Sequence, residues 1–489
     1  MPSQVNSLDG DLDTKTAKLN EFKAVLEKYA VHVQVTTRES LHPNAMMHDR
    51  AAVIPALVVS PKSEWGVSKA LTLMTDRKLY DHFEVSVKSG GHGYFNGASC
   101  QDIMLNMASM NQRRIVGDTM FLEPGCVLAQ VIDILAKHGK AVPHGDCFGV
   151  GAGGHFLTAG WDLLLGRRYG LGCQSVIGGR VVLWNGEILE VSQKTHPHLL
   201  YAMRGGAVAE VGVVTEIWLS VIDQPTLATW RFTPIDWEQL RTCARYQTFQ
   251  RATALSRDIT VSFRFHFEPT QTDPVCSFNI VSLGTARDTI NQLFSDLGLE
   301  VASIVDNPSE WNEKSLLDLR LLPASECLTR NPGMLGEVSA GGLHQSPGVF
   351  WNNLACSREM APSFFRSISH WVKPNCDEML LDLWKQFDSA KEHKFRSRMY
   401  ALVIVGGGAI TECQDSCSMP LGQALARFEV HWDEHGDKHF CDGFTNQVSN
   451  IIESYEDKGP GRPYRGDIWR EDQAYHKDDP LKKIREAYS

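Results

Sequence analysis

Two glycine-rich stretches of the chain each carry a side chain that can form a covalent bond with a ligand. The first, residues 89–94, reads Ser-Gly-Gly-His-Gly-Tyr and contains His92. The second, residues 145–155, contains five glycines with Cys147 among them and ends at His155. Such glycine clusters are tolerated where a ligand approaches the main chain, and their successive free N–H groups suit an anion such as a pyrophosphate. The two stretches therefore predict a phosphate-bearing cofactor with a possible attachment side chain in each loop.

A dinucleotide-binding fingerprint is the alternative for residues 149–154, Gly-Val-Gly-Ala-Gly-Gly. That fingerprint needs a strand before it, a regular helix after it and an acidic residue about 20 positions further on. Pro143 and the short segment at Val142 are poor strand material, and Cys173-Gln-Ser stands where the acid is wanted. The sequence therefore disfavours a nicotinamide cofactor.

Taken together, the two stretches resemble the flavin-linked oxidases of the vanillyl-alcohol oxidase and p-cresol methylhydroxylase superfamily, and within it the berberine-bridge-enzyme-like branch. The likeness covers residues 45–220 most closely, including Tyr201-Ala-Met-Arg-Gly-Gly and the run 211–217. It implies an α+β fold of two domains, a PCMH-type FAD-binding domain and a substrate domain of antiparallel sheet covered by helices. It also implies an FAD held by two covalent bonds, from His92 to the flavin 8α-methyl group and from Cys147 to flavin C6.

The resemblance also indicates which residues surround the flavin. We expect His155 to be structural, and Val150 to leave dioxygen room at the ring, with simple packing as the alternative. Tyr94 and His144 either line the ring edge or pack. The expected cofactor-binding residues are His92, Cys147, Ser89, Gly90, Gly91, Gly93, Tyr94, Gly145, Val150, Gly151, Gly153, Gly154, His155, Gly212 and Val213.

Two departures from the family pattern stand in this region. Trp161-Asp162 interrupts the family's glycine run, and Ala207-Val208-Ala209 replaces its glycine-rich continuation. Both departures put the local backbone in question while leaving the expectation of flavin binding in place.

The order of predicted elements divides the chain into three parts. A β-α-β pattern over residues 54–88 delivers the His92 loop to the end of a strand, where α/β sheets usually hold ligands. The composition shifts after Asp223-Gln-Pro225. We predict an FAD-binding domain at 1–224, a substrate-binding domain at 225–440 and a C-terminal segment at 441–489 that returns to the FAD domain. In the substrate domain we predict strands at 259–267, 276–281, 399–405 and 424–432 and helices at 363–372 and 378–389.

The catalytic candidates come from one strand and from the C-terminal region. Because strand side chains alternate, Arg427, Glu429 and His431 share one face of the segment 424–432. That polar face fits a sheet lining a polar cavity, with a face open to water as the alternative. The resemblance implies a proton acceptor from such a strand and from a tyrosine, and Arg462-Pro-Tyr-Arg-Gly-Asp467 places the latter at Tyr464, with ordinary packing as the alternative. The motif is imperfect, since a proline replaces the family's asparagine and one extra residue precedes Asp467.

Composition limits the partners and the compartment. The net charge of −10 disfavours nucleic acid or an anionic membrane as the main partner. No apolar run approaches the roughly 18 residues of a membrane span, and the polar N-terminus shows no signal pattern, so we expect a cytoplasmic protein unless a signal was removed. The 12 cysteines form no metal spacing, so no metal is expected. Cys413 and Cys417 form either a disulfide or two separate thiols.

These observations predict an FAD-dependent oxidase. Its substrate would be an alcohol or amine group of a small organic molecule of the secondary-metabolite type, and dioxygen would be converted to hydrogen peroxide. The alternatives are an FAD-dependent oxidative cyclase that forms a C–C or C–O bond, a cyclase without net redox change on the same scaffold, and a flavin-binding protein without activity. Oxygen uptake with peroxide release separates the oxidase and the oxidative cyclase from the cyclase without redox change. Bound flavin that no substrate reduces would indicate the protein without activity.

Overall fold

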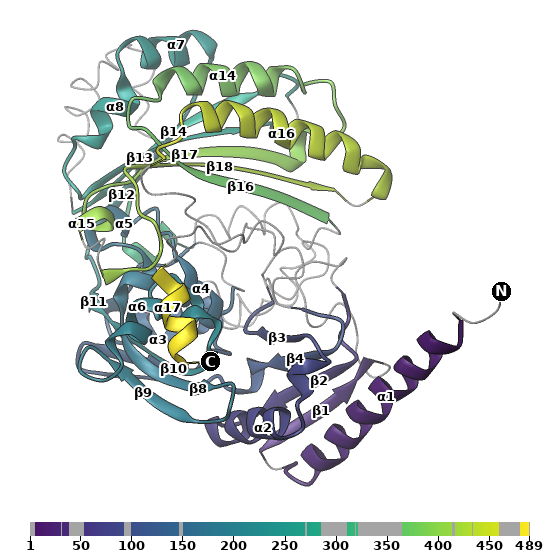
Figure 1. The fold of residues 1–489 in the computed structure, drawn as a ribbon. Helices are drawn as coiled ribbons and strands as arrows, with labels where there is room; N and C mark the ends of the chain where they lie inside the picture. Colours follow the sequence, from purple (N-terminus) through teal and green to yellow (C-terminus); the bar gives the residue numbers. More distant parts are fainter. Residues whose placement is uncertain are drawn as a thin grey trace, which may run out of the picture.

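The computed structural model describes residues 5–30, 32–38, 53–91, 99–145, 150–268, 271–284, 311–317, 319–320, 364–412, 416–432, 434–458 and 480–488. His92, Gly93, Tyr94, Cys147 and Tyr464 lie outside the described residues, as does the side chain of His431. Figure 1 shows two bodies, an N-terminal domain that also holds the last helix and a second domain built on one large sheet.

The N-terminal domain begins with a four-stranded sheet in the order β1-β2-β4-β3. Strand β3 runs parallel to β4 and ends directly before Ser89, so the first glycine-rich stretch leaves the carboxyl end of a strand. The Ser63 hydroxyl accepts a hydrogen bond from the Gly66 N–H at 3.2 Å and starts α2 as its N-cap. The elements are β1 (Val33–Thr37), β2 (Leu57–Pro61), β3 (Val85–Lys88), β4 (Ile103–Asn106), α1 (Val5–Glu27) and α2 (Glu64–Asp76).

A five-stranded antiparallel sheet in the order β5-β6-β10-β8-β9 completes this domain. Leu481 and Ile484 of the C-terminal helix α17 belong to the same apolar cluster as Phe156 and Val181, so this helix packs on the N-terminal domain. The elements are β5 (Arg113–Val116), β6 (Thr119–Leu122), β8 (Val176–Leu183), β9 (Ile188–Ser192), β10 (Gly212–Ser220), α3 (Leu128–Lys137), α4 (Ala152–Thr158), α6 (Pro197–Met203) and α17 (Pro480–Tyr488).

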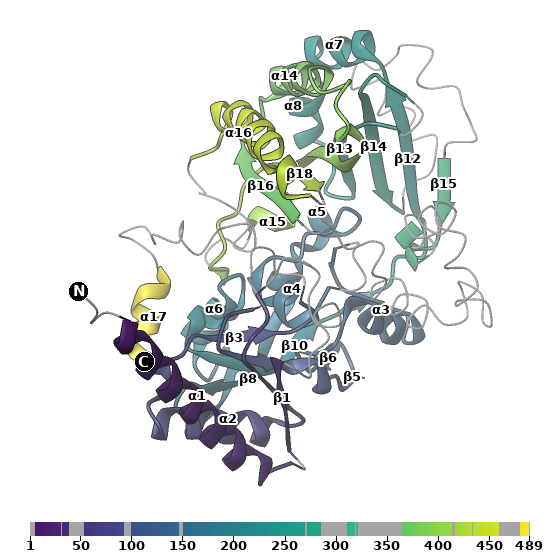
Figure 2. The same ribbon diagram turned by 90° about the vertical axis from the view of Figure 1, so that its right-hand side faces the viewer.

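The second domain is a seven-stranded sheet in the order β15-β12-β14-β13-β17-β18-β16. Figures 1 and 2 show helices α7, α14 and α16 on the face of this sheet that is turned away from the N-terminal domain. The elements are β12 (Ala228–Ile235), β13 (Ile259–His266), β14 (Val275–Leu283), β15 (Trp311–Lys314), β16 (Phe364–Val372), β17 (Met399–Val405), β18 (Ala424–Trp432), α7 (Trp237–Arg245), α8 (Thr248–Thr253), α14 (Asp377–Asp388) and α16 (Lys438–Ser454).

Short elements connect these layers. They are the strands β7 (Lys140–Ala141) and β11 (Ile222–Asp223), the helices α5 (Gly166–Tyr169) and α15 (Ala409–Glu412), and the 3-10 helices η3 (Leu79–Asp81), η4 (Met107–Ser109), η5 (Gly172–Ser175), η6 (Ala207–Glu210), η10 (Arg396–Arg398) and η12 (His435–Asp437).

The helix predicted at 363–372 is wrong. Phe364–Val372 instead form strand β16, which pairs with β18 along its whole length. Ser367 and His370 lie on opposite faces of this strand and are each 3% exposed. Because both faces are buried, the segment shows no clear alternation, and the pairing with a distant strand outweighs the local pattern.

The C-terminal part of the chain is shared between the domains. The predicted boundary at 440 falls inside α16, and that helix packs on strands β16 and β18 of the second domain. Helix α17 packs on η6 and α6 of the N-terminal domain. The return to the first domain is therefore made by the last helix, after α16 has completed the second.

Neither a membrane-spanning helix nor a metal cluster is found among the described residues. No helix there combines the length and apolar character that crossing a bilayer requires. No group of three or more His, Cys, Asp or Glu side chains in the same residues is placed to hold a metal ion.

Candidate functional site

The two glycine-rich stretches lie against each other. Ser89 and Gly90 follow strand β3, and Gly151 and Gly153 lie at the start of helix α4. The Gly153 N–H donates to Ser89 Oγ at 3.2 Å, and that hydroxyl donates to the carbonyl oxygen of Pro124. A Cβ atom on Gly151 would collide with Gly90 N and Ser89 Oγ, so only glycine allows this approach. The two stretches that the resemblance assigns to one flavin are therefore in contact with each other.

One side of helix α4 is open. Gly154 is exposed, and no described atom lies within 4 Å of the position that its Cβ would take. Gly91 has a φ of +77°, a left-handed conformation that glycine adopts without strain. Two adjoining glycine loops with an open side fit the approach of a phosphate-bearing cofactor such as FAD. The described residues that would hold it are Ser89, Gly90, Gly91, Gly151, Gly153 and Gly154.

His155 fixes the main chain that enters the Cys147 loop. Its Nε2 accepts a hydrogen bond from the Gly145 N–H at 3.1 Å. Burial lowers the pKa of His155 to about 4, although the charge of Asp162 opposes this, so the imidazole is neutral at pH 7. A neutral ring keeps the lone pair on Nε2 that this hydrogen bond requires. His155 therefore acts on the loop through the main chain of Gly145.

Asp162 ties the same loop to the second domain, a role that sequence reasoning missed. Its Oδ2 accepts hydrogen bonds from the His144 N–H at 2.9 Å and from Arg320 Nη2 at 2.6 Å. Its Oδ1 accepts from the main-chain N–H groups of Leu164 and Leu165 at 2.8 and 3.1 Å. Burial would raise the pKa of Asp162, but the charge of Arg320 and these hydrogen bonds hold it below its usual value. The carboxylate is therefore ionised and paired.

The signal that could have found Asp162 is its place in the sequence. Trp161-Asp162 interrupts the glycine run of the family, and a charged residue in such a run needs a partner when it is buried. The side chains of Asp162 and Arg320 are 0% and 4% exposed. Arg320 stands where the resemblance is weakest, so the pair itself could not be predicted.

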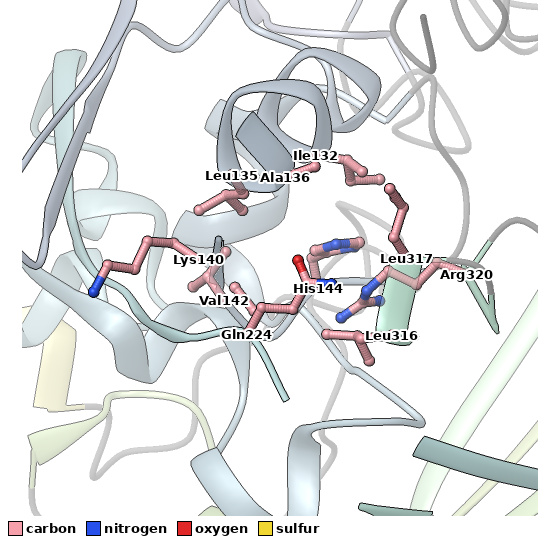
Figure 3. Close-up of a pocket in the computed structure, with 11 residues that line it drawn as sticks. Ile132, Leu135, Ala136, Lys140, Val142, His144, Gln224, Leu316, Leu317 and Arg320 are labelled. Atoms are coloured by element: carbon pink, nitrogen blue, oxygen red, sulfur yellow. The ribbon is translucent and has the colours of Figure 1, made fainter. Parts of the chain in front are cut away.

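A hollow lies beside this ion pair, at the seam between the two domains (Figure 3). Its volume is about 270 Å³, which includes space open to solvent. Figure 3 shows Ile132 and Leu135 of α3 on one side and Leu316 on the other, with His144 and Arg320 between them. Burial lowers the pKa of His144 to about 3, and the charge of Arg320 lowers it further, so this imidazole is also neutral. The ion pair thus lies beside mostly apolar side chains where the two domains meet.

Val150, Gly212 and Val213 are packed against protein. Val150 is half-buried against the apolar cluster of the N-terminal domain, and Val213 is 2% exposed in a second cluster that includes Val182. Gly212 pairs with Leu183, and a Cβ atom on it would meet the carbonyl oxygen of Val182. The roles of all three beside a cofactor stay predictions.

The turn η6 keeps a left-handed backbone without any glycine. The φ angles of Ala207, Val208, Ala209 and Glu210 are +47°, +57°, +57° and +62°. This conformation costs roughly 1–2 kcal/mol for each residue with a Cβ atom. The Trp184 indole N–H donates to the Glu210 carbonyl oxygen at 2.6 Å, and the side chains of Val208 and Ala209 are buried. Packing therefore holds the turn in a conformation that this sequence does not favour locally.

The second domain presents a buried polar sheet face on the side opposite its helices. In β18, Ala426 and Phe428 join the helix-covered core, while Arg427 and Glu429 lie on the other face. Arg427 donates to the Glu429 carboxylate, and Glu429 is 6% exposed. The Arg427 side chain is 20% exposed, and the choice between a lined cavity and a face open to water stays a prediction.

Unpaired polar atoms lie on the same face. Ser277 Oγ, Asn279 Oδ1 and Ser367 Oγ are buried and have no hydrogen-bond partner in the described part of the chain. The register places Ser367 opposite Glu429, and Ser277 opposite Arg264 two strands away from β18. Because buried polar atoms without partners are rare, this face fits contact with a bound polar molecule or water.

Comparison with known proteins identifies the cofactor. A family model described as an FAD binding domain matches residues 55–192, which include both glycine-rich stretches. The chitooligosaccharide oxidase of Gibberella zeae is 34% identical over 190 residues, 38% of this chain and 37% of that protein. Berberine bridge enzyme-like 23 of Arabidopsis thaliana is 29% identical over 183 residues, 36% and 34% of the two chains. The chain thus matches about a third of the length of its curated relatives.

The fold is shared over almost the whole chain. The structure of BBE-like 1 from Physcomitrella patens superposes with a TM-score of 0.77 and 16% identity, covering 95% of this chain and 96% of that one. This likeness confirms the predicted two-domain α+β architecture with a PCMH-type FAD-binding domain. The chain therefore carries an FAD binding domain, matched over residues 55–192, and shares the fold of the BBE-like structure.

Proposed function

We propose that the protein is an FAD-dependent oxidase that oxidises an alcohol or amine group of a small organic substrate, of the secondary-metabolite type, and releases hydrogen peroxide. The observation that carries this proposal is the contact between the two glycine-rich stretches. Ser89 and Gly90, shortly before His92, touch Gly151 and Gly153, shortly after Cys147. Curated relatives named as oxidases support the choice of dioxygen as the electron acceptor.

When bound, FAD would supply the hydride- and electron-transfer chemistry of the oxidation. The main chain of residues 89–91 and of Gly154 would hold the cofactor's phosphates, while the Ala152 and Gly153 N–H groups keep the second stretch in place. His155 and Asp162 hold the main chain on the N-terminal side of the Cys147 loop. The sheet face with Arg427 and Glu429 orients the polar part of the substrate. Val150 is assigned the control of dioxygen access.

We assign covalent attachment of FAD to His92 and Cys147. An imidazole and a thiol are suited to this role because both side chains are nucleophiles, and each belongs to one of the two loops assigned to the cofactor. Attachment at two points requires a fixed spacing between the two loops. The close fit of Gly151 against Gly90 fixes that spacing.

The mass and absorption spectrum of the denatured protein test the cofactor assignment. A yellow chain that is heavier by one FAD is expected, and removal of both His92 and Cys147 should release the flavin. Complete loss of flavin from the wild-type chain on denaturation contradicts covalent attachment. Oxygen uptake matched by peroxide release then tests the reaction, and turnover of substrate without oxygen uptake contradicts the oxidase.

Tyr464 is assigned the removal of the substrate proton, with Glu429 and His431 of strand β18 as the other acceptors. Replacement of Tyr464 by Phe should slow substrate-dependent flavin reduction by about 10²-fold or more, the usual scale of general base catalysis. Tyr455 is the matched control, because its hydroxyl donates to Asp382 at 3.3 Å on the helix-covered side of the sheet. Stopped-flow rates for Tyr464→Phe and Tyr455→Phe that fall together contradict the assignment.

A further inference from the structure

Two cysteines from different domains meet in the interior of the molecule. Cys173 in η5 and Cys417 lie with their Sγ atoms 3.9 Å apart. Their residues are 0% and 3% exposed. They belong to an apolar cluster that combines Ala159, Trp161 and Leu171 of the N-terminal domain with Trp371, Ile404, Met419, Leu421 and Leu425 of the second domain. The two thiols therefore lie across the interface that joins the domains.

The segment around Cys417 is held in place by the N-terminal domain. The Cys417 thiol donates to the Arg204 carbonyl oxygen at 3.0 Å, and the Ser418 N–H donates to the same oxygen at 2.9 Å. A Cβ atom on Gly205 would come within 2.9 Å of the main-chain nitrogen of Met419, so the main chains of these two segments pack closely. Because these contacts fix the segment beside η5, the approach of the two sulfur atoms is a property of the folded chain.

We propose that Cys173 and Cys417 form a disulfide that cross-links the two domains. A disulfide requires an S–S distance of about 2.05 Å, so the sulfur atoms must approach by about 2 Å from van der Waals contact. This approach requires rotation of both side chains or a shift of the 416–419 segment. The sequence draws attention instead to Cys413 and Cys417, but the described neighbour of Cys417 is Cys173.

The oxidation balances with a peroxide as the two-electron oxidant. The thiolate of Cys417 attacks hydrogen peroxide, the O–O bond breaks, and Cys417 becomes a sulfenic acid while hydroxide leaves. The Cys173 thiol then attacks this sulfur, the S–S bond forms, and water leaves with the proton of Cys173. In total the two thiols lose two electrons and two protons, and one peroxide becomes two water molecules.

The rate should depend on pH. The hydrogen bond with Cys417 and burial raise the pKa of the Cys173 thiol well above its usual value. The Cys173 thiolate, the nucleophile that closes the S–S bond, is therefore scarce at neutral pH, and the cross-link should form slowly there and faster as the pH rises. Only the source of the oxidant depends on the proposed function, because the oxidase reaction would release peroxide.

Peptide mapping after oxidation tests the proposal. Fully reduced protein is treated with added hydrogen peroxide, alkylated under denaturing conditions and digested with trypsin and an Asp-directed protease, since Asp415 lies between Cys413 and Cys417. We expect a linked pair of peptides containing Cys173 and Cys417, lighter by two hydrogen atoms than the two reduced peptides and separated by a reductant. Both thiols found alkylated, or Cys417 linked to Cys413, would overturn the proposal.

Variants and stability provide the second readout. Cys173→Ser and Cys417→Ser should each abolish the link and the rise in thermal midpoint that follows oxidation, whereas Cys441→Ser, at a buried cysteine of helix α16, should keep both. If a variant fails to fold, the map of the wild-type chain still decides. Because peroxide is added and no substrate is used, failure of the oxidase proposal does not affect this result.

Discussion

Asp162 carries more of the site's architecture than its place between glycines suggests. It is the acceptor for two main-chain N–H groups that follow it, for the His144 N–H and for Arg320 of the other domain. His144 and Gly145 lead directly into the Cys147 loop, so a change at Asp162 reaches the cofactor region without touching it. The buried carboxylate tolerates its surroundings because each oxygen accepts at least two hydrogen bonds.

Breaking this ion pair should destabilise the protein strongly. Asp162→Asn or Arg320→Met alone leaves one buried charge without its partner, which costs about 3–5 kcal/mol. The double variant removes both charges and should lose less than the sum, with a coupling of about 1–3 kcal/mol. Urea unfolding of the four proteins measures the cycle. Additive single effects would mean that the two residues act independently.

At the scale of elements, the sequence predicts individual strands better than the contacts between distant segments. The alternation in 424–432 predicts both the strand β18 and the face on which Arg427 and Glu429 lie. Segment 363–372 misleads because both faces of β16 are buried, and its partner lies more than fifty positions away in the sequence. That the two glycine-rich stretches serve one cofactor is implied by the resemblance, whereas the Asp162–Arg320 pair depends on the placement of a second domain.

The glycine loops offer a matched pair of variants. Gly151→Ala places a methyl group against the main chain of Gly90, which cannot move aside cheaply, so stability should fall by about 1–3 kcal/mol and bound FAD should fall with it. Gly154→Ala meets no described atom and removes a glycine from a helix, so the flavin-free protein should gain about 0.5–1 kcal/mol.

The amount of FAD bound by Gly154→Ala then reports on the open side of helix α4. A lower ratio of flavin to protein absorbance, in a variant that unfolds no earlier than wild type, places the cofactor there. A wild-type ratio would mean that the cofactor lies elsewhere. Gly151→Ala must lose both stability and flavin for the contact between the stretches to matter.

Replacement of an exposed glutamate by glycine should stabilise the protein in the left-handed turn η6 and destabilise it elsewhere. Glu210 is exposed and has a φ of +62°, so Glu210→Gly removes backbone strain without losing packing and should stabilise the protein by about 1 kcal/mol. Glu187 is also exposed but has no left-handed backbone, so Glu187→Gly should destabilise by about 0.5–1 kcal/mol. Thermal unfolding of both variants decides, and two changes of the same sign contradict the strain.

At the scale of the whole molecule, the domains are joined by an apolar cluster and by buried cations. Trp161 and Trp371 face each other across the interface with ring centroids 5.6 Å apart. Arg167 of α5 is 3% exposed and reaches the second domain. Its guanidinium donates to the carbonyl oxygens of Thr253, Leu255, Ser256 and Ile259, which run from the end of α8 to the start of β13. These contacts make the seam part of the folded core.

Neighbouring arginines separate the effect of burial from that of charge. Arg167→Met leaves several buried carbonyl oxygens without a donor and should destabilise the protein by roughly 3 kcal/mol or more, since a hydrogen bond to a charged group contributes about 1.5–3 kcal/mol. Arg168 also crosses between the domains, to Asp258 at 2.6 Å, but its side chain is 42% exposed. Arg168→Met should therefore cost less than about 1 kcal/mol.

The shape of the unfolding curve shows whether Arg167 couples the unfolding of the two domains or only stabilises the protein. Loss of the buried joint should let the domains unfold separately, so Arg167→Met should show two transitions by tryptophan fluorescence where wild type and Arg168→Met show one. Arg167→Lys should recover only part of the loss, because a single ammonium group cannot reach all four carbonyl oxygens as the planar guanidinium does. Equal effects of the two methionine variants, with one transition in each, would show that the apolar cluster alone holds the domains together.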